Sequence, residues 1–184
     1  KNILQNVLDD EYNEKKAYKV IHYMKNRWYL VNLKKSIFLV KDPEKNISEK
    51  TLIENNYWTI LKKHCKDFTN NKRYIWWIKA LELNLNNFEI PDEILLINDT
   101  KQSTETVIFD KQIMFKTYIN KDKNLFNQFK KNTNKIKIGI NTFTIANIEL
   151  ALLESLYNPS IISEKYIQEL IKKVYSVKRQ VYTS

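Results

Sequence analysis

The sequence contains one glycine, Gly139, one cysteine, Cys65, and three prolines in 184 residues. A glycine-rich phosphate-binding loop needs several glycines, so this class of nucleotide site is excluded. One cysteine allows no intrachain disulfide, and with only two histidines besides, no zinc site of cysteine and histidine ligands can be assembled. No apolar run approaches the roughly 20 residues that span a bilayer, and no secretory signal pattern is visible. We therefore expect a cytoplasmic protein that binds neither metal nor cofactor and does not contact a membrane.

The composition is that of a globular protein, and the positive charge is concentrated in certain regions. Hydrophobic residues make up 43% of the sequence and charged residues 28%. Of the net charge of +10, residues 1–66 carry +6, residues 67–120 carry −2 and residues 121–184 carry +6. The densest basic region is residues 14–41, with eight lysines and arginines and one acidic residue, Glu14. This asymmetry favours a negatively charged partner such as nucleic acid.

A helix and a β-hairpin are predicted in the basic region. Residues 14–27 carry an apolar stripe at helical spacing, with Asn13 as a helix cap. This stripe consists of Ala17, Val20, Ile21, Met24 and Trp28. Residues 29–33 and 37–40 read as two strands, joined by the polar break Lys34, Lys35 and Ser36. Residues 2–10 have one apolar face and predict a short helix before them.

The rest of the chain alternates helical and strand-like segments, which predicts an α+β protein. Helices are expected at residues 48–63, 74–85, 146–157 and 163–176, and strands at residues 93–97, 104–109, 113–119, 135–140 and 142–145. Residues 66–72 read as a polar loop, residues 120–134 as a loop or a frayed helix, and Gly139 as a bulge. We expect an N-terminal domain at residues 1–66, and at residues 67–184 a mixed domain with a small, largely antiparallel sheet.

A helix, a turn, a second helix and a lysine-tipped hairpin follow one another as in a winged helix-turn-helix. A helix fits the major groove of double-stranded DNA, and a hairpin beside it can reach the neighbouring backbone. Base edges are usually met early on the second helix, and flexible ammonium groups suit phosphates. The predicted base-contacting residues are Lys15, Lys16, Tyr18 and Lys19, with His22 on the same face, and the predicted phosphate contacts are Lys25, Lys34 and Lys35.

Other functions are weighed against DNA binding. Asp92, Asp99, Glu105 and Asp110 lie on or near predicted strands, and Pro91 with Asp92 faintly resembles the start of a metal-dependent nuclease motif. That motif needs an acid-x-Lys on the following strand, and residues 110–112 fall in a turn instead. His64 and Cys65 are adjacent on a helix and point about 100° apart, so they are not expected to form a nucleophile pair. A nuclease and a purely protein-binding module remain the alternatives to a non-enzymatic DNA-binding regulator.

Four stretches resemble the AbiEi family of antitoxins from type IV toxin–antitoxin systems. Residues 16–30 and 33–40 resemble the family's DNA-binding helix and wing. Residues 74–81 resemble its aromatic helix, and residues 145–154, followed by Pro159, are similar to its Glu-Arg-Ala-Leu-Leu-Asp helix. Leu150 stands where the family usually has arginine, and Ser36 where the wing usually has glycine.

The resemblance implies a winged helix-turn-helix repressor from an abortive-infection (phage-defence) system. Such a protein binds operator repeats in front of its own operon and helps to neutralise a nucleotidyltransferase-like toxin. From the resemblance we expect the family's first motif helix to be absent or truncated at the start of this sequence. In the family's terms, Glu149 and Glu154 are structural residues of the second domain.

Overall fold

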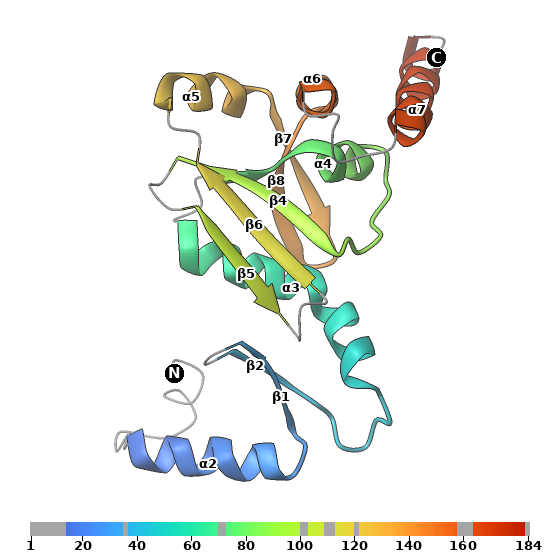
Figure 1. Ribbon diagram of the computed structural model, residues 1–184. Coiled ribbons are helices and arrows are strands. Elements are labelled where there is room, and N and C mark those ends of the chain that lie inside the picture. The colour runs from blue at the N-terminus through green and yellow to red at the C-terminus, as the bar shows by residue number, and fades with distance from the viewer. Residues whose placement is uncertain are drawn as a thin grey trace. The chain divides into compact units, whose positions relative to one another are not determined.

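The computed structural model describes residues 14–34, 37–69, 73–99, 103–108, 113–119, 122–157 and 164–182 (Figure 1). The chain divides into two compact units, Lys1–Asn56 and Tyr57–Ser184, here called the N-terminal and C-terminal units. The boundary lies within helix α3 (Glu49–Thr69). The sequence placed it between residues 66 and 67, close to the end of that helix. The α+β class is confirmed by helices, a small antiparallel sheet and a larger mixed sheet.

The N-terminal unit contains the predicted helix followed by the predicted hairpin. Helix α2 (Glu14–Asn26) is joined to strands β1 (Leu30–Lys34) and β2 (Ile37–Val40), which pair antiparallel. Their register matches Val31 with Leu39 and shifts between Asn32 and Lys34. The helix predicted at residues 2–10 lies outside the described residues, so the complete winged helix-turn-helix stays a prediction.

The C-terminal unit is built on a six-stranded sheet in the order β5-β6-β4-β3-β8-β7. The strands are β3 (Arg73–Ile75), β4 (Glu93–Asn98), β5 (Thr104–Ile108), β6 (Ile113–Ile119), β7 (Thr133–Ile138) and β8 (Asn141–Ala146). Strand β6 lies between β5 and β4. It pairs antiparallel with β5 and parallel with β4, and β3 is also parallel to β8. The sheet is therefore mixed, whereas the sequence predicted a largely antiparallel one.

Helices cover both faces of this sheet because alternate side chains of each strand point to opposite faces. On one face α3 packs its aromatic rings on the strands, with Tyr57 5.9 Å from Phe115 and Trp58 5.6 Å from Phe143 between centroids. On the other face the ring of Tyr74 stacks on that of Phe126 in α5. The helices there are α4 (Trp77–Asn84), α5 (Lys123–Lys131) and α6 (Ile148–Tyr157), and α7 (Glu164–Tyr182) adjoins α6 (Figure 1).

Buried polar contacts join these helices to the sheet and to one another. The carboxylate of Glu154 in α6 accepts hydrogen bonds from the Tyr74 hydroxyl at 3.0 Å and the Trp77 backbone amide at 3.2 Å. Within α4, the Lys79 ammonium lies 2.7 Å from Glu82, and both side chains are nearly inaccessible to solvent. Glu82 also accepts a hydrogen bond from the Tyr166 hydroxyl of α7. The contacts of Glu154 and of Tyr166 each fix one element against another, whereas the pair of Lys79 and Glu82 lies within α4 and keeps both buried charges partnered.

Four sequence predictions in this unit differ from the structure. Residues 74–85 are a strand and then a helix, because Arg73–Ile75 pairs with strands on both sides. Residues 66–69 continue α3 rather than starting a loop, and residues 123–131 form an ordered helix with Asp122 as its cap. Gly139 lies in the turn between β7 and β8 rather than in a bulge, and its φ of 57° explains the glycine. None of the helices in the described part of the chain is long and apolar enough to cross a membrane.

Candidate nucleic-acid interface

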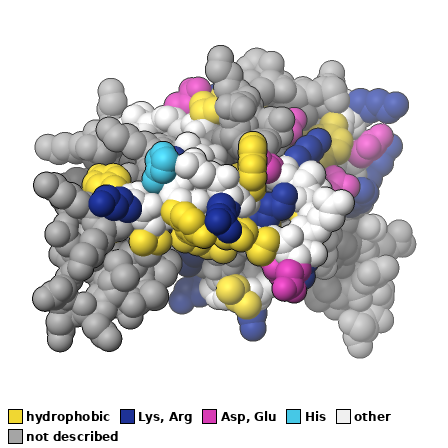
Figure 2. Space-filling view, turned by 90° about the horizontal axis from the view of Figure 1, so that it is seen from below, with side chains coloured by type: hydrophobic (Ala, Val, Ile, Leu, Met, Phe, Trp, Pro, Cys, Tyr) yellow, Lys and Arg dark blue, Asp and Glu magenta, His cyan; other side chains and the backbone are white. Residues whose placement is uncertain are grey.

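The outward face of α2 is polar. Its apolar residues Ala17, Val20, Ile21 and Met24 fall on one side, and Ala17 is buried. At about 100° per residue, the opposite side is centred on Lys19, His22 and Asn26, and all three are exposed. Tyr18 and Tyr23 flank this row and are 67% and 54% exposed. In Figure 2, which looks at the molecule from below, basic and hydrophobic side chains adjoin one another on this face.

Helix α2 ends in a left-handed turn. The Tyr29 amide donates to the Met24 carbonyl at 2.9 Å, and the Trp28 amide donates to the Lys25 carbonyl at 3.0 Å. This pair of bonds is the Schellman arrangement, in which the residue after the helix takes a positive φ. Trp28 is that residue, with φ of 61°. The hairpin follows at once, and the Lys41 amide closes its base by donating to the Tyr29 carbonyl at 2.8 Å.

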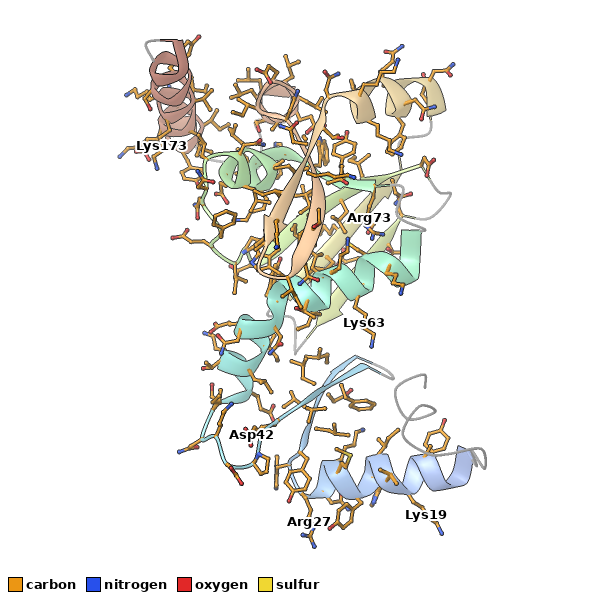
Figure 3. All side chains as sticks on the ribbon, turned by 180° about the vertical axis from the view of Figure 1, so that it is seen from behind. Lys19, Arg27, Asp42, Lys63, Arg73 and Lys173 are labelled. Carbon is orange, nitrogen blue, oxygen red and sulfur yellow. The ribbon has the colours of Figure 1, made fainter. Side chains whose placement is uncertain are left out.

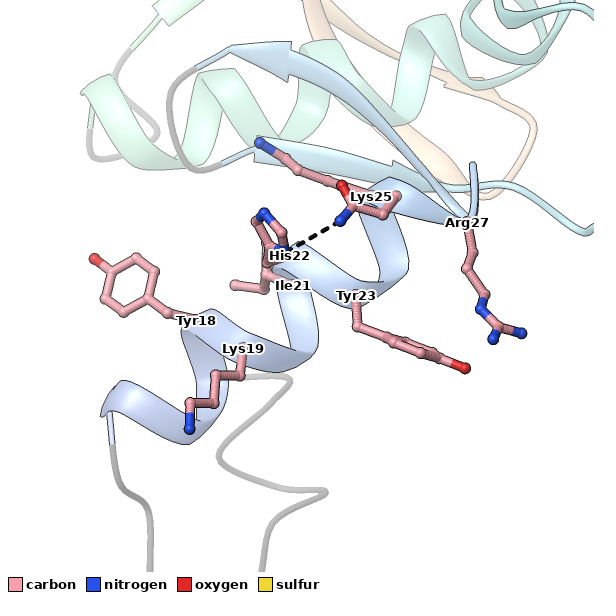
Figure 4. Close-up of a pocket in the computed structure, with 8 residues that line it drawn as sticks. Tyr18, Lys19, Ile21, His22, Tyr23, Lys25 and Arg27 are labelled. Carbon is pink, nitrogen blue, oxygen red and sulfur yellow. Dashed lines mark hydrogen bonds between the residues drawn. The ribbon is translucent and has the colours of Figure 1, made fainter.

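Aromatic rings hold two of the basic side chains. The Arg27 guanidinium lies 4.8 Å from the centroid of the Tyr23 ring, and the Lys25 ammonium lies 4.7 Å from that of Phe38 in β2. Both distances are within the range of a cation–π attraction. Lys25 is thereby directed to the hairpin, while Lys19 and Arg27 point away from it (Figures 3 and 4).

His22 and Asn26 form a hydrogen-bonded pair one turn apart. The Asn26 amide nitrogen lies 3.2 Å from His22 Nδ1, as the dashed line in Figure 4 marks. An amide nitrogen can only donate, so the contact requires an imidazole with its proton on Nε2. The pair therefore offers the Nε2–H donor of His22 and the Oδ1 acceptor of Asn26 to a ligand.

An open pocket of about 740 Å³ runs along this helix (Figure 4). It is lined by Tyr18, Lys19, Ile21, His22, Tyr23, Lys25, Asn26 and Arg27. Its lining is basic and aromatic, and no acidic residue occurs in the sequence between Glu14 and Asp42. A flat or extended anion is the ligand that suits such a surface.

The predicted DNA-binding residues are only partly brought together. Tyr18, Lys19 and His22 share the outer side of α2, whereas Lys25 turns to the hairpin. Lys15 and Lys16 lie in the first turn of α2 and Lys34 ends β1, and these three are described by their backbone alone. Lys35 lies outside the described residues.

Sequence reasoning missed four residues of this surface. Tyr23 and Asn26 were visible on the polar side of the helical pattern, and Arg27 in the cluster of basic residues, yet none was counted as a contact. Trp28 was assigned to the apolar stripe, and this was wrong, because its side chain is 75% exposed. The helix ends at Asn26, so its periodicity no longer determines where Trp28 points.

The residues weighed for catalysis do not assemble into a site. His64 and Cys65 belong to α3 and are both buried, with the His64 ring 5.0 Å from that of Phe115 in β6. Of the carboxylates, Asp92 and Glu105 are exposed, Asp99 is half-buried and Asp110 is outside the described residues. Among the residues that are described, no three histidine, cysteine or acidic side chains lie close enough to hold a metal ion.

Glu154 and Tyr74 are a buried pair of titratable side chains. Burial raises the pKa of the Glu154 carboxyl to about 7, against the opposing effect of hydrogen bonds from the Trp77 backbone, Tyr74 and Trp76. Burial also raises the pKa of the Tyr74 hydroxyl, and Glu154 adds to this. The carboxyl fastens α6 to β3 and α4, which agrees with the structural role expected of it.

No model of a known protein family matches the chain, and no curated protein matches it either.

Proposed function

We propose that the N-terminal unit binds double-stranded DNA, with α2 in the major groove and the β1-β2 hairpin beside it as a wing. The observation that carries this proposal is the outer row of α2, where Lys19, His22 and Asn26 are exposed together. An α-helix with its side chains is roughly 10–12 Å across and fits the major groove. Asparagine can form two hydrogen bonds with adenine, and lysine can bind guanine or phosphate.

Charge supports the same surface. Eight basic residues and no acidic ones occupy residues 15–41. Arg27 is held on Tyr23 at the end of the helix, and Lys25 lies against the hairpin, so positive charge flanks the outer row on both sides. Phosphate contacts of this kind position a protein on DNA and provide most of its affinity.

The biological role follows from the resemblance to AbiEi antitoxins. We propose that the protein is a transcriptional regulator that represses its own toxin–antitoxin operon. The C-terminal unit then takes part in neutralising the toxin. The role as a repressor depends on the DNA binding proposed for α2, and that binding can be tested with this chain alone.

The first test compares Lys19→Ala and Asn26→Ala with Lys173→Ala. Lys173 is an exposed lysine on α7 in the C-terminal unit and serves as the matched control (Figure 3). Binding of the full chain to a 30-base-pair random-sequence duplex is measured by fluorescence anisotropy at several salt concentrations. We expect Lys19→Ala to lower the slope of log affinity against log salt by roughly 0.9, the value for one lost phosphate contact. Lys173→Ala should leave the slope unchanged.

Asn26→Ala tests base recognition separately. The wild-type protein is first used to select the duplexes that it binds best from random-sequence DNA. On these selected duplexes we expect Asn26→Ala to bind about 5- to 100-fold more weakly than the wild type, as for a lost contact to a base. On unselected duplex its affinity should change little. Equal slopes for the Lys19 and Lys173 variants, or no duplex binding at 150 mM salt by the wild type, would contradict the proposal and favour a protein-binding module.

A further inference from the structure

Trp28 combines a strained backbone with an exposed side chain. A residue other than glycine in the left-handed region destabilises the folded state by on the order of 1 kcal/mol. Trp77 also has a positive φ, of 65°, but its indole is buried, so core packing offsets the strain there. Asn86, the third such residue, is of a type that tolerates this conformation. The indole of Trp28 is 75% exposed, so packing within the described part of the chain does not offset its strain.

The surroundings of Trp28 point to the chemistry of its partner. Arg27 precedes it and lies on the exposed ring of Tyr23, and Lys25 is within the same turn. An apolar protein surface placed on this indole would have to desolvate the neighbouring cations without compensating them. A nucleobase offers a flat apolar face and is attached to an anionic backbone, so it satisfies the indole and the cations together.

The face of a base is accessible only where the stack of the duplex is interrupted. In fully paired DNA both faces of each base are covered by its neighbours, whereas an unpaired nucleotide can turn out and stack on an aromatic side chain. We propose that Trp28 stacks on an unpaired base, so that the N-terminal unit prefers duplex DNA with an unpaired nucleotide to fully paired duplex. This inference rests on the DNA binding proposed for α2.

The test uses the full chain and two 30-base-pair duplexes that differ in one central unpaired 2-aminopurine. Affinity is measured by anisotropy, and stacking by the quenching of 2-aminopurine fluorescence. We expect the wild type to bind the bulged duplex about 5- to 100-fold more tightly than the paired one and to quench the probe. Trp28→Ala should lose both the preference and the quenching, and Trp28→Tyr should keep most of each.

Two controls separate a contact from a structural role. Tyr175→Ala removes a ring that is 73% exposed on α7 and should change neither readout. Trp28→Gly removes the indole and relieves the backbone, so it should lose the preference while melting at a higher temperature than Trp28→Ala. A lost preference with raised stability is a result that misfolding does not produce.

The outcomes distinguish the two proposals. If the wild type binds both duplexes equally, or if Trp28→Ala keeps the preference, stacking by Trp28 is overturned and DNA binding by α2 stands. If the wild type binds neither duplex at 150 mM salt, both proposals are overturned.

Discussion

Among single residues, the reactivity of the Cys65 thiol measures how well the core around α3 is closed to solvent. Its side chain is buried in α3, and burial raises the pKa of its thiol to about 11, although Arg73 and Lys62 act in the opposite direction. Because the thiolate is the reacting species, we expect the native protein to react with an aromatic disulfide reagent at pH 8 about 100-fold more slowly than the urea-unfolded chain. The sequence has no second cysteine, so the whole signal reports this site. Equal rates would mean that α3 opens readily.

Trp28 is a single residue whose position the sequence could not predict. The polar row of α2 follows from helical spacing alone, so Lys19 and His22 were predicted to share a face, and they do. Trp28 could not be placed in the same way, because a left-handed turn is normally marked by glycine and this chain has tryptophan there. Whether these residues contact DNA stays a prediction.

At the scale of elements, the cap of α5 explains an ordered helix where the sequence predicted a loop or a frayed helix. Asp122 Oδ1 accepts hydrogen bonds from the amides of Asn124 at 2.8 Å and Leu125 at 3.1 Å. Phe126 and Phe129 then lie on one side, and Phe126 is fully buried against Tyr74. The Lys and Asn residues around them hid this pattern, because a nine-residue helix is decided by its cap and its tertiary contacts as much as by propensity.

Replacing the cap should therefore weaken the C-terminal unit. We expect Asp122→Ala to lower the free energy of unfolding by about 1 kcal/mol, because two amides lose their acceptor. Asp122→Asn keeps a capping oxygen and should lose less than half of that. Urea unfolding followed by far-ultraviolet circular dichroism measures both. If the two variants were equally stable, the cap would not be the cause.

The strands show a second limit of sequence reasoning. The hairpin of β1 with β2 was predicted, and so were the two strands that form the hairpin of β7 with β8, since each hairpin joins neighbours in the sequence. Strand β3 was read as the start of a helix, because its three residues are all buried and show no alternation. What makes it a strand is pairing with β4 on one side and with the distant β8 on the other, and local spacing carries no sign of that.

At the scale of the whole molecule, Glu154 links stability to pH. Its folded pKa of about 7 lies above the ordinary value of 4.5, so the folded state binds the proton more tightly than the unfolded state does. The stabilisation by this proton is complete below about pH 4.5, declines as the pH rises, and is lost above about pH 7. A shift of this size corresponds to roughly 3 kcal/mol.

The variant Glu154→Gln imitates the protonated carboxyl. Its amide can donate to the Tyr74 hydroxyl and its oxygen can accept from the Trp77 amide, two of the groups that hydrogen-bond to Glu154. We expect the variant to match the wild type at pH 4.5 and to be more stable by up to about 3 kcal/mol at pH 8. Urea unfolding at half-unit steps of pH measures this difference. Parallel curves for the two proteins would show that Glu154 titrates normally.

The pairing of β3 with β8 also has a consequence for how the protein is made. Ile75 pairs with Ile145, so about 70 residues must be added after β3 before its second edge can be covered. At translation rates of roughly 5–20 residues per second, the nascent chain waits about 4–14 s with that edge unpaired. An uncovered strand edge can pair with a strand of another chain, and neighbouring ribosomes on one messenger RNA carry nascent chains with the same uncovered edge. We therefore expect the yield of folded protein to fall as those ribosomes become more crowded.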